Sequence, residues 1–333
     1  MRLLIITQKI DKKDPVLGFF HLWVEEFSKH CESIIVVCLY KGEYTLPSNV
    51  KVLSLGKEIK QSRFSYIKNL YTYIWNERKN YDAVFVHMNQ EYIVLAGLIW
   101  RLLKKKIYMW RNHHAGSVLT DIAAGFCTHV FCTSRFSYTA KYAKTKIMPV
   151  GVDTNLFKKT LPAKPKSVLS WGRIAPSKNI DIFVEVAKQN PDLSFDVYGD
   201  ALPKDGQYLE DLKANAGTNV VFHKAALLEQ SVDIYSSHEF FINLSSSGMY
   251  DKTIFEAMAC GCIVLASNDN LKGNIPDDLI FSNRDTLELS QKLKKVGAYS
   301  DQQKEELRKS LEIFTDKHSL KNLGRELFKI LWM

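Results

Sequence analysis

The sequence contains no run of about 18 apolar residues, which is the length that a membrane-spanning helix needs. Its longest apolar stretch, Tyr92 to Trp100, stops at Arg101. The opening residues, MRLLIITQKIDKKD, have too short an apolar part for a signal peptide and no small-residue cleavage site. We therefore expect no membrane-spanning helix, and we expect the N-terminus to form a first buried strand.

Metal-binding and redox patterns are also missing. None of the six cysteines belongs to a C-x-x-C pair, and no cysteine and histidine cluster has zinc-finger spacing. We expect reduced, mostly buried thiols in a cytoplasmic protein, with no metal and no other cofactor. No G-x-G-x-x-G follows a predicted strand, which argues against a nicotinamide-dependent dehydrogenase.

The size and composition are those of a globular protein. A chain of 333 residues suits two domains of about 150 residues each. The hydrophobic share of 46% is enough for two cores, and the charged share of 24% is ordinary.

Positive charge gathers in the first half. Residues 1–160 hold 24 Lys+Arg against 12 Asp+Glu (+12), and residues 161–333 hold 21 against 24 (−3), which sums to the net +9. A basic half attracts anionic partners, but no nucleic-acid-binding module is present and we expect no nucleic acid. Arg101 and the run Lys104–Lys106 beside apolar residues favour an anionic membrane surface, hence a peripheral location at its cytoplasmic face. A solvated charged helix end explains the same cluster, and both interpretations stay open.

Short apolar runs alternate with helical patterns, which predicts α/β architecture with doubly wound parallel sheets. Expected helices include Phe19–His30, Ser65–Arg78, Ile180–Gln189 and Thr253–Cys260. The expected strands are Arg2–Thr7, Ser33–Leu39, Val50–Leu55, Ala83–His87, Ile107–Arg111, His129–Thr133, Ser167–Trp171, Ser194–Tyr198, Val220–Phe222, Phe240–Leu244, Ile263–Ala266 and Leu279–Phe281.

A polar segment with two prolines divides the chain. We expect an N-terminal Rossmann-like domain over 1–157, a linker over 158–166 and a C-terminal Rossmann-like domain over 167–310. Residues 311–333 should form a C-terminal helix that crosses back to the N-terminal domain. Ligands of open parallel sheets bind beyond the carboxyl ends of the strands, so two domains facing across a cleft would suit a two-part substrate.

The first chemical motif is Ser170–Asn179 (SWGRIAPSKN), between a predicted strand and a helix. Gly172 permits close backbone approach. Arg173 and Lys178 bring two cations to a strand end, where they would hold a diphosphate without a metal. A surface turn with two solvated cations is the alternative.

The second motif is Asn243–Gly261 (NLSSSGMYDKTIFEAMACG), a strand that enters a Ser/Gly loop and then a helix. A helix start supplies free N–H donors and a favourable dipole for phosphate, and the Thr253 hydroxyl adds a donor. Glu256 lies among apolar residues and therefore needs partners. Two vicinal ribose hydroxyls would satisfy it; a helix-start carboxylate that only meets the dipole is the alternative.

Together these motifs resemble family 4 of the retaining glycosyltransferases, which have the two-domain GT-B fold. Pro149–Phe157 (PVGVDTNLF) is similar to that family's hinge signature. The resemblance implies that Arg173 and Lys178 bind the donor diphosphate. It also implies that Glu256 is the second carboxylate of an E-x7-E motif and binds the donor ribose.

The sequence departs from that motif at its first carboxylate, which would contact the donor sugar. Residue 248 is Gly248, which leaves the donor sugar undetermined, and Asp251 and Lys252 in the same loop would compensate. The resemblance places nucleobase contacts at the backbone around His223, so the base cannot be read from side chains. The implied donor-binding residues are Gly18, Gly172, His223, Gly248, Met249, Tyr250, Asp251, Lys252, Thr253 and Glu256.

In the first half, Gly18 resembles the family's N-terminal loop glycine. One of two adjacent histidines, His114 in preference to His113, is similar to a histidine that contacts the donor sugar; the alternative is a structural hydrogen bond. The implied catalytic residues are Arg173, Lys178, His114 and Glu256. The acceptor-side candidates are His21, His87, Asn89 and His113.

The expected function is therefore retaining, metal-independent transfer of a sugar from a nucleotide diphosphate-sugar, UDP in preference to GDP. The acceptor would be a hydroxyl of a glycan or lipid-linked molecule in cell-envelope polysaccharide or glycoconjugate synthesis. A GT-B nucleotide-sugar epimerase and a catalytically weak nucleotide-sugar-binding subunit remain as alternatives. Gly248 motivates the second of these.

Overall fold

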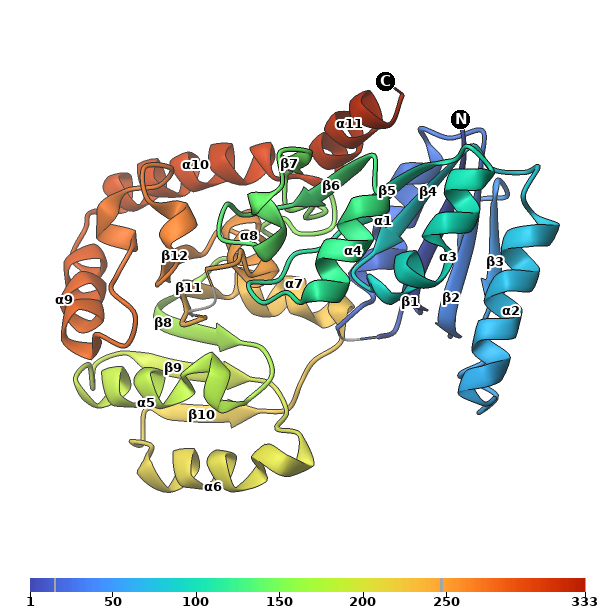
Figure 1. The fold of residues 1–333 in the computed structure, drawn as a ribbon. Coiled ribbons are helices and arrows are strands. Elements are labelled where there is room, and N and C mark those ends of the chain that lie inside the picture. Colours follow the sequence, from blue (N-terminus) through green and yellow to red (C-terminus); the bar gives the residue numbers. More distant parts are fainter. Residues whose placement is uncertain (15, 246–247, 333) are drawn as a thin grey trace. The chain divides into compact units, whose positions relative to one another are not determined.

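The structure is a computed structural model that describes residues 1–14, 16–245 and 248–332. The chain divides into two compact units. The first combines Met1–Gly151 with the C-terminal helix that begins at Leu320, and the second is Val152–Ser319. Each unit is a parallel sheet with helices packed on it (Figure 1).

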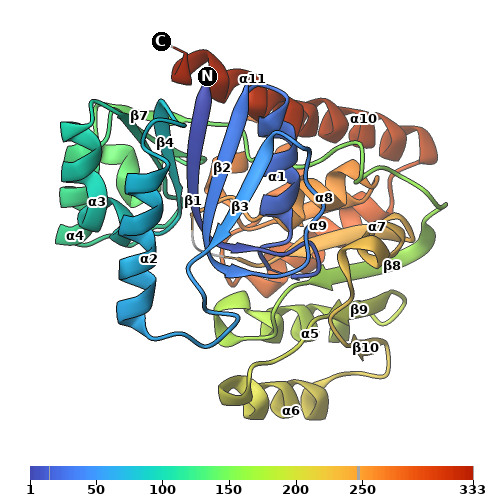
Figure 2. The same ribbon diagram turned by 90° about the vertical axis from the view of Figure 1, so that its right-hand side faces the viewer.

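The sheet of the first unit has the order β3-β2-β1-β4-β5-β6-β7, and all its pairs are parallel. Figure 2 shows β1, β2 and β3 side by side. The strands are β1 (Arg2–Ile10), β2 (Ser33–Lys41), β3 (Val50–Ser54), β4 (Ala83–His87), β5 (Lys106–Trp110), β6 (His129–Cys132) and β7 (Thr145–Ile147). The helices are α1 (Phe19–Ser28), α2 (Arg63–Asn76), α3 (Glu91–Leu102), α4 (Val118–Phe126), the short η1 (Tyr138–Lys141) and α11 (Leu320–Leu331).

Successive side chains of β1 point to opposite faces of the sheet, so this strand contributes side chains to the cores on both faces. Leu3 and Ile5 lie in one core with α1 and α11, while Leu4 and Ile6 lie in the other with α2, α3 and α4. Burial on both faces explains why β1 reads as a continuous apolar run rather than an alternating one.

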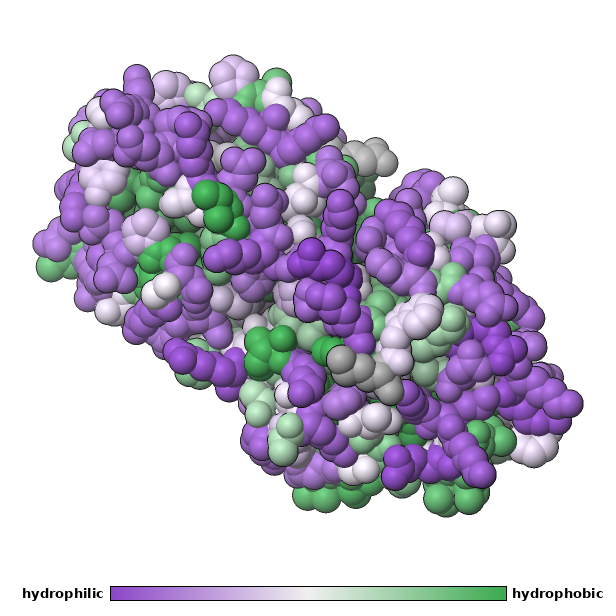
Figure 3. All heavy atoms as spheres, turned by 90° about the horizontal axis from the view of Figure 1, so that it is seen from above, coloured by the Kyte–Doolittle hydropathy of each residue, from purple (hydrophilic) through white to green (hydrophobic). Residues whose placement is uncertain are grey.

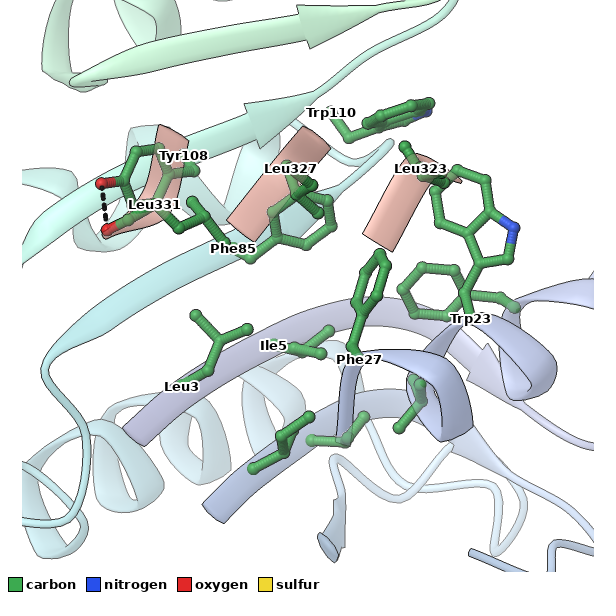
Figure 4. Packing of buried hydrophobic residues seen from close by; sticks show 14 of the residues in the cluster. Leu3, Ile5, Trp23, Phe27, Phe85, Tyr108, Trp110, Leu323, Leu327 and Leu331 are labelled. Carbon is green, nitrogen blue, oxygen red and sulfur yellow. Dashed lines mark hydrogen bonds between the residues drawn. The ribbon is translucent and has the colours of Figure 1, made fainter. Parts of the chain in front are cut away.

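The C-terminal helix α11 packs into the first of these cores. Its leucines at Leu320, Leu323, Leu327 and Leu331 recur at helical spacing and are all buried. Figure 4 shows three of them directed at sheet residues and at the aromatic side chains of α1. The Tyr108 hydroxyl donates a hydrogen bond to the carbonyl oxygen of Leu331 at 3.5 Å.

The second unit repeats the plan with five parallel strands in the order β10-β9-β8-β11-β12. The strands are β8 (Lys164–Trp171), β9 (Ser194–Tyr198), β10 (Val220–His223), β11 (His238–Asn243) and β12 (Ile263–Ala266). The helices are η2 (Pro176–Lys178), α5 (Ile180–Lys188), η3 (Pro203–Asp205), α6 (Gly206–Asn215), α7 (Leu228–Ser236), α8 (Lys252–Ala259), η4 (Asp269–Leu271), η5 (Asp277–Leu279), α9 (Thr286–Gly297) and α10 (Asp301–Lys317).

The expected strands other than Leu279–Phe281 overlap a strand of the structure. The prediction at Leu279–Phe281 was wrong, because this stretch forms only an isolated bridge between Ile280 and Ala266 after a short 3₁₀ turn. The three-residue β7 (Thr145–Ile147) was not predicted. It is short and its residues are exposed or half-buried, so it carries no apolar signal.

The unit boundaries differ from those expected. Val152 donates its N–H to the carbonyl of His318, and the ring of Phe157 meets that of Tyr235, so the second unit begins before residue 158. The expected linker shortens because β8 starts at Lys164. The helical stretch after Asp301 breaks at residues 318–319 into α10 and α11, and the contacts of α11 belong to the first unit.

All six cysteines are free thiols, and five of them are buried. No helix within the described residues is long and apolar enough to cross a membrane. The face in Figure 3, which looks down on the side of α10 and α11, is mainly hydrophilic with scattered apolar residues.

Candidate functional site

Both chemical motifs of the second unit follow the two strands between which its chain order reverses. β8 and β11 are neighbours in the sheet, while β8 connects outward to β9 and β11 connects to β12. A reversal of this kind leaves a crevice at the carboxyl ends of the strands, where open α/β sheets bind ligands. The turn after β8 and the loop after β11 therefore occupy the expected binding edge of this sheet.

Lys178 joins these two segments. Its Nζ donates a hydrogen bond to Ser245 Oγ at 3.0 Å and lies 2.6 Å from Asp251 Oδ2. Next to it, Asn179 adopts a left-handed conformation and donates from its amide to the carbonyl of Leu244. A Cβ on Gly172 would stand 4.0 Å from Lys178 Cε. Lys178 of the first motif is thus held across the strand ends by partners from the second motif.

Asp251 is the N-cap residue of α8, and its carboxylate accepts hydrogen bonds from donors at the start of that helix. Its Oδ1 accepts from the backbone N–H of Thr253 at 3.2 Å and from the Thr253 hydroxyl at 2.9 Å, which is an N-cap. Burial alone would raise the pKa of Asp251, but the charge and hydrogen bonds of Lys178 and the bonds from Thr253 outweigh it and lower this pKa to about 2. Asp251 is an ionised partner for Lys178 at neutral pH.

Glu256 lies on the same helix, half-buried and close to Lys252. Burial raises the pKa of Glu256 and lowers that of Lys252, while the attraction between the two opposes both shifts. The hydroxyl of Tyr235, from α7, donates to Glu256 Oε2 at 3.3 Å. The carboxylate is therefore oriented by a buried tyrosine and keeps acceptor capacity for a ligand.

The loop between β11 and α8 is tied to two asparagines. The carbonyl of Gly248 accepts from the Asn270 amide at 2.5 Å, and that of Met249 accepts from the Asn268 amide at 2.6 Å. Met249 is itself buried, and the Tyr250 hydroxyl donates to the carbonyl of Asn270 at 2.9 Å. Ser246 and Ser247 of this motif lie outside the described residues.

Gly248 has φ +65°, a left-handed conformation that costs a residue with a side chain about 1–2 kcal/mol. This backbone conformation favours glycine at the position where the E-x7-E motif would have a glutamate.

An aromatic row follows the ends of β8, β9 and β10. Trp171 stacks on Tyr198 with ring centroids 5.5 Å apart, and Tyr198 stacks on His223 at 4.2 Å. His223 Nε2 lies 2.6 Å from Asp196 Oδ1, so its ring is engaged within the protein. Contact of the backbone of this stretch with a nucleobase stays a prediction.

Arg173 is exposed and has no hydrogen bond or ion pair within the part of the chain that the structure describes. It follows Gly172, whose N–H donates to the carbonyl of Tyr198. The backbones approach so closely here that a Cβ on Gly199 would stand 1.9 Å from the Gly172 carbonyl oxygen. The arginine is therefore an unengaged cation on a tightly fixed strand end.

In the first unit, two of the acceptor-side candidates are structural. His87 is 2% exposed, stacks on Phe20 at 3.9 Å and shares a hydrogen bond of 3.2 Å with Thr7 Oγ1. His21 is also buried, and its Nε2 accepts from the backbone N–H of Thr45 at 3.1 Å. Both rings are enclosed by the packing around α1, and their role on the acceptor side stays a prediction.

The remaining candidates of this unit are more accessible. His113 and His114 are exposed and stack on each other at 4.6 Å, with His113 Nδ1 accepting from the N–H of Ala115. Asn89 is half-buried. Gly18 precedes α1, and a Cβ there would stand 2.5 Å from the carbonyl oxygen of Asp14, so the loop requires glycine. Pro15 of the same loop lies outside the described residues.

Four residues that contact the candidate site or lie at a strand end of the first unit were not identified from the sequence: Tyr235, Asn268, Asn270 and Met88. The first three act through contacts with residues about 20 positions away. Met88 follows the last residue of β4 and has φ +68°, a strained conformation for a bulky residue. Nothing in their types or local spacing signals these roles.

No group of three or more His, Cys, Asp or Glu side chains within residues 1–14, 16–245 and 248–332 is arranged to hold a metal ion. The donors described above are ammonium, amide and hydroxyl groups, which suit an anion.

Residues 152–276 match the family model described as glycosyl transferases group 1. This stretch lies within the second unit and carries both motifs. It confirms the predicted resemblance at the level of group 1; family 4 and the retaining mechanism stay predictions.

Two curated relatives come from Streptococcus pneumoniae. The GtfA subunit of the UDP-N-acetylglucosamine–peptide N-acetylglucosaminyltransferase is 30% identical over 128 residues, 37% of this chain and 25% of the relative. The alpha-monoglucosyldiacylglycerol synthase is 25% identical over 252 residues, 61% of this chain and 56% of the relative. The chain thus matches between about a quarter and just over half of the length of these relatives.

Among solved structures, HepE of Anabaena in complex with UDP and glucose superposes with a TM-score of 0.78 and 17% identity, covering 100% of this chain and 99% of that one. A likeness at this identity shows the fold. It confirms the predicted GT-B fold class with two Rossmann-like units.

Proposed function

We propose that this protein is a retaining, metal-independent glycosyltransferase that moves a sugar from a UDP-sugar to a hydroxyl of a glycan or lipid-linked acceptor. One observation carries the proposal. Within the stretch that matches the group 1 glycosyl transferases, Lys178, the start of α8 and Glu256 gather at the binding edge of a single sheet.

In this proposal the donor diphosphate binds where Lys178 now pairs with Asp251. Arg173 and Lys178 supply two positive charges, and the start of α8 adds the helix dipole. Charge-assisted hydrogen bonds of this kind are worth about 1.5–3 kcal/mol each in a site with little water. They would stabilise the negative charge that develops on the departing UDP without a metal ion.

Glu256 binds the donor ribose. Two vicinal hydroxyls donate to its carboxylate, which Tyr235 already orients. Burial holds the pKa of Glu256 above its usual range, so a ligand that donates two hydrogen bonds to the charged form relieves part of that cost. Asp251 and Lys252 take the sugar contacts that a glutamate at position 248 would make in the related family.

No covalent nucleophile is assigned. Asp251 is held by Lys178 and Thr253, and Glu256 is assigned to the ribose, so a double displacement through two carboxylates, as in retaining glycosidases, is not proposed. The acceptor hydroxyl attacks the anomeric carbon on the face from which UDP leaves, and a phosphate oxygen takes its proton. His114 contacts the transferred sugar.

Uridine is preferred to guanosine as the donor nucleoside. Support comes from similar proteins: one relative is a subunit of a UDP-N-acetylglucosamine–peptide N-acetylglucosaminyltransferase, and HepE was solved with UDP. An acceptor attached to a lipid is supported by the synthase of a glucosyldiacylglycerol.

An apolar and basic surface on the first unit supports a peripheral membrane location. Leu98 and Leu102 of α3 are 61% and 75% exposed, and Val118 of neighbouring α4 is 73% exposed. The two helices are packed closely, because a Cβ on Gly97 would stand 2.7 Å from the Phe126 ring. We call the exposed side chains of this pair the α3–α4 surface: Leu95, Leu98, Leu102, Val118, Leu119 and Ile122.

The α3–α4 surface continues into exposed cations at Arg101, Lys104 and Lys106. Apolar side chains beside a basic cluster are what an interfacial helix presents to anionic lipids. The proposed partner is the anionic cytoplasmic face of a membrane that carries the acceptor.

The experiment is to incubate the protein with UDP-glucose, UDP-N-acetylglucosamine, GDP-mannose and a lipid extract containing glycolipid acceptors, with and without EDTA. We expect a UDP-sugar to be consumed, a glycosylated lipid to form at the same rate with EDTA, and NMR to show the donor's anomeric configuration in the product. Conversion of the donor to its epimer without acceptor would support the epimerase instead. Donor binding without turnover would support a binding subunit.

A further inference from the structure

The second unit contains a pocket of about 680 Å³ that the proposed transfer does not use. Pockets of 300–1,000 Å³ are typical of small-molecule sites. The residues that line it begin β8, precede β9, begin β11, and come from α9 and α10. In a parallel sheet, strand starts and strand ends lie at opposite edges. The pocket is therefore at the edge opposite Lys178 and the start of α8.

The backbone that forms one wall of this pocket departs from regular strand geometry at the start of β8. The pairing of β8 with β11 shifts register between His238 and Phe240, so β8 bulges. Within the bulge Lys166 has φ +61° and donates its N–H to Glu239 Oε2 at 2.6 Å. Bulges and left-handed non-glycine residues concentrate at functional sites, where they redirect side chains.

The carboxylate at the base of the pocket is already neutralised. Glu239 is 7% exposed, and its Oε1 lies 2.8 Å from Lys304 Nζ of α10. Arg308, one turn further along α10, donates from Nε to the carbonyl of Gly261 at 3.1 Å. The buried negative charge in this pocket is thus paired, and it does not attract a cation.

Three further lysines line the pocket: Lys159, Lys166 and Lys294. Their ammonium groups form no ion pair within the residues that the structure describes. Two exposed carboxylates, Asp192 and Asp301, partly offset them. The lining holds five cationic and three acidic side chains in all, so it favours an anion.

Apolar groups make up much of the remaining lining. Pro162, Pro165 and Pro191 are exposed and Leu193 is half-buried, whereas Phe240 and Leu293 lie almost wholly inside the core behind them. An inorganic anion would leave this surface in contact with water, whereas an organic group would cover it. Cations together with an apolar wall select a molecule that has both an anionic group and an apolar part.

We propose that this pocket binds an organic phosphate monoester with an apolar organic part, separately from the nucleotide-sugar. The phosphate lies among Lys159, Lys166 and Lys294, and the organic part covers the side chains of Pro165 and Leu193.

The experiment is calorimetric titration of the full chain with n-hexyl phosphate and with inorganic phosphate. We expect hexyl phosphate to bind to one site at least tenfold more tightly. The double variant Lys159→Ala/Lys294→Ala should weaken that binding at least tenfold. Lys204→Ala/Lys213→Ala, which removes the same charge from exposed positions of the same unit, should leave it within twofold.

A second arm separates the two sources of such a phosphate. Dodecyl phosphate in phosphatidylcholine vesicles presents the group at a bilayer, and loss of its binding in the Lys159/Lys294 variant would indicate a lipid ligand. Loss limited to hexyl phosphate would indicate a soluble one. Equal binding of inorganic and hexyl phosphate, or equal binding by the two double variants, would overturn the proposal. Circular dichroism of each variant checks that both fold, and the Lys178→Ala variant should keep the hexyl phosphate site.

Discussion

The ammonium group of Lys178 lies 2.6 Å from Oδ2 of Asp251, the N-cap residue of α8. This ion pair joins the turn after β8 to the start of α8. The same carboxylate caps α8 through Thr253. In the proposed mechanism Lys178 exchanges this partner for the donor diphosphate. The pair therefore links the stability of α8 to the availability of the catalytic cation.

Replacing Asp251 separates its two roles. Asp251→Ala removes both the cap and the ion pair and should lower the stability of the second unit by about 1–2 kcal/mol. Asp251→Asn keeps an N-cap acceptor, because asparagine caps helices as well as aspartate does, and should cost less. Urea denaturation followed by circular dichroism measures both. Equal losses in the two variants would show that the cap contributes nothing.

Glu256 is tested by removing one hydroxyl from the ligand instead of from the protein. The wild-type protein should prefer UDP to 2′-deoxy-UDP by roughly tenfold or more, since a hydrogen bond to a charged group is worth about 1.5–3 kcal/mol. In Glu256→Gln the preference should fall below threefold. Calorimetry with both nucleotides gives the two ratios. An unchanged preference would remove Glu256 from the ribose site.

His318 makes the stability of the protein depend on pH. It is enclosed by the rings of Tyr250, Phe255 and Phe314, and burial, aided by the charge of Lys317, lowers its pKa to about 4. The unfolded chain has the ordinary histidine pKa of about 6.5 and so binds more protons between these values. Stability should fall as the pH drops from 6.5 to 4, by up to about 1.4 kcal/mol per pH unit from this group.

The control for this prediction is His318→Phe, which keeps an aromatic ring and cannot titrate. Thermal denaturation between pH 7 and pH 4 should show a shallower decline for this variant than for the wild type. Parallel declines would assign the acid sensitivity to other groups.

The α3–α4 surface should govern attachment to membranes. Leu98→Ser/Leu102→Ser should lower binding to phosphatidylglycerol vesicles by about tenfold. The variant buries less apolar surface in the lipid interface than the wild type does. Leu287→Ser/Ile313→Ser alters similarly exposed residues of the second unit and serves as the control. Vesicle co-sedimentation at two salt concentrations measures the effect. If salt does not weaken the binding of the wild-type protein to these vesicles, the claim that the basic cluster attracts anionic lipids is contradicted.

Gly248 should resist conversion to the glutamate of the E-x7-E motif. Its φ of +65° disfavours any residue with a side chain, so Gly248→Glu and Gly248→Ala should both lose about 1–2 kcal/mol of stability. Donor turnover should not rise in Gly248→Glu. A gain in turnover without loss of stability would show that the loop accepts a glutamate.

Local periodicity predicted most of the strands because burial on both faces gives uninterrupted apolar runs, as in β1 and β4. It failed at Leu279–Phe281, where the apolar run begins in a 3₁₀ turn and continues only into an isolated bridge. It also missed β7, whose exposed residues carry no pattern. Whether either segment forms a strand depends on its pairing with a neighbouring strand, and the residues of a single segment do not show that pairing.

The sequence predicted that Lys178 and the start of α8 lie at the same strand ends, but it did not predict the ion pair between Lys178 and Asp251. It did not predict Tyr235 or Asn270, which reach the site from other elements. It could not show how His87 is oriented, because a histidine at a strand end looks the same in sequence whether it faces a ligand or stacks on Phe20. Packing of α1 decides that, and packing depends on the whole fold.

The most direct test of the account is the steady-state rate of UDP release by Lys178→Ala with the preferred UDP-sugar and acceptor. A variant with native circular dichroism should show kcat lowered by about 100-fold or more, as expected when a donor to the developing charge is removed, while Lys204→Ala should match the wild type. A kcat for Lys178→Ala within threefold of the wild-type value would contradict the claim that Lys178 stabilises the departing diphosphate.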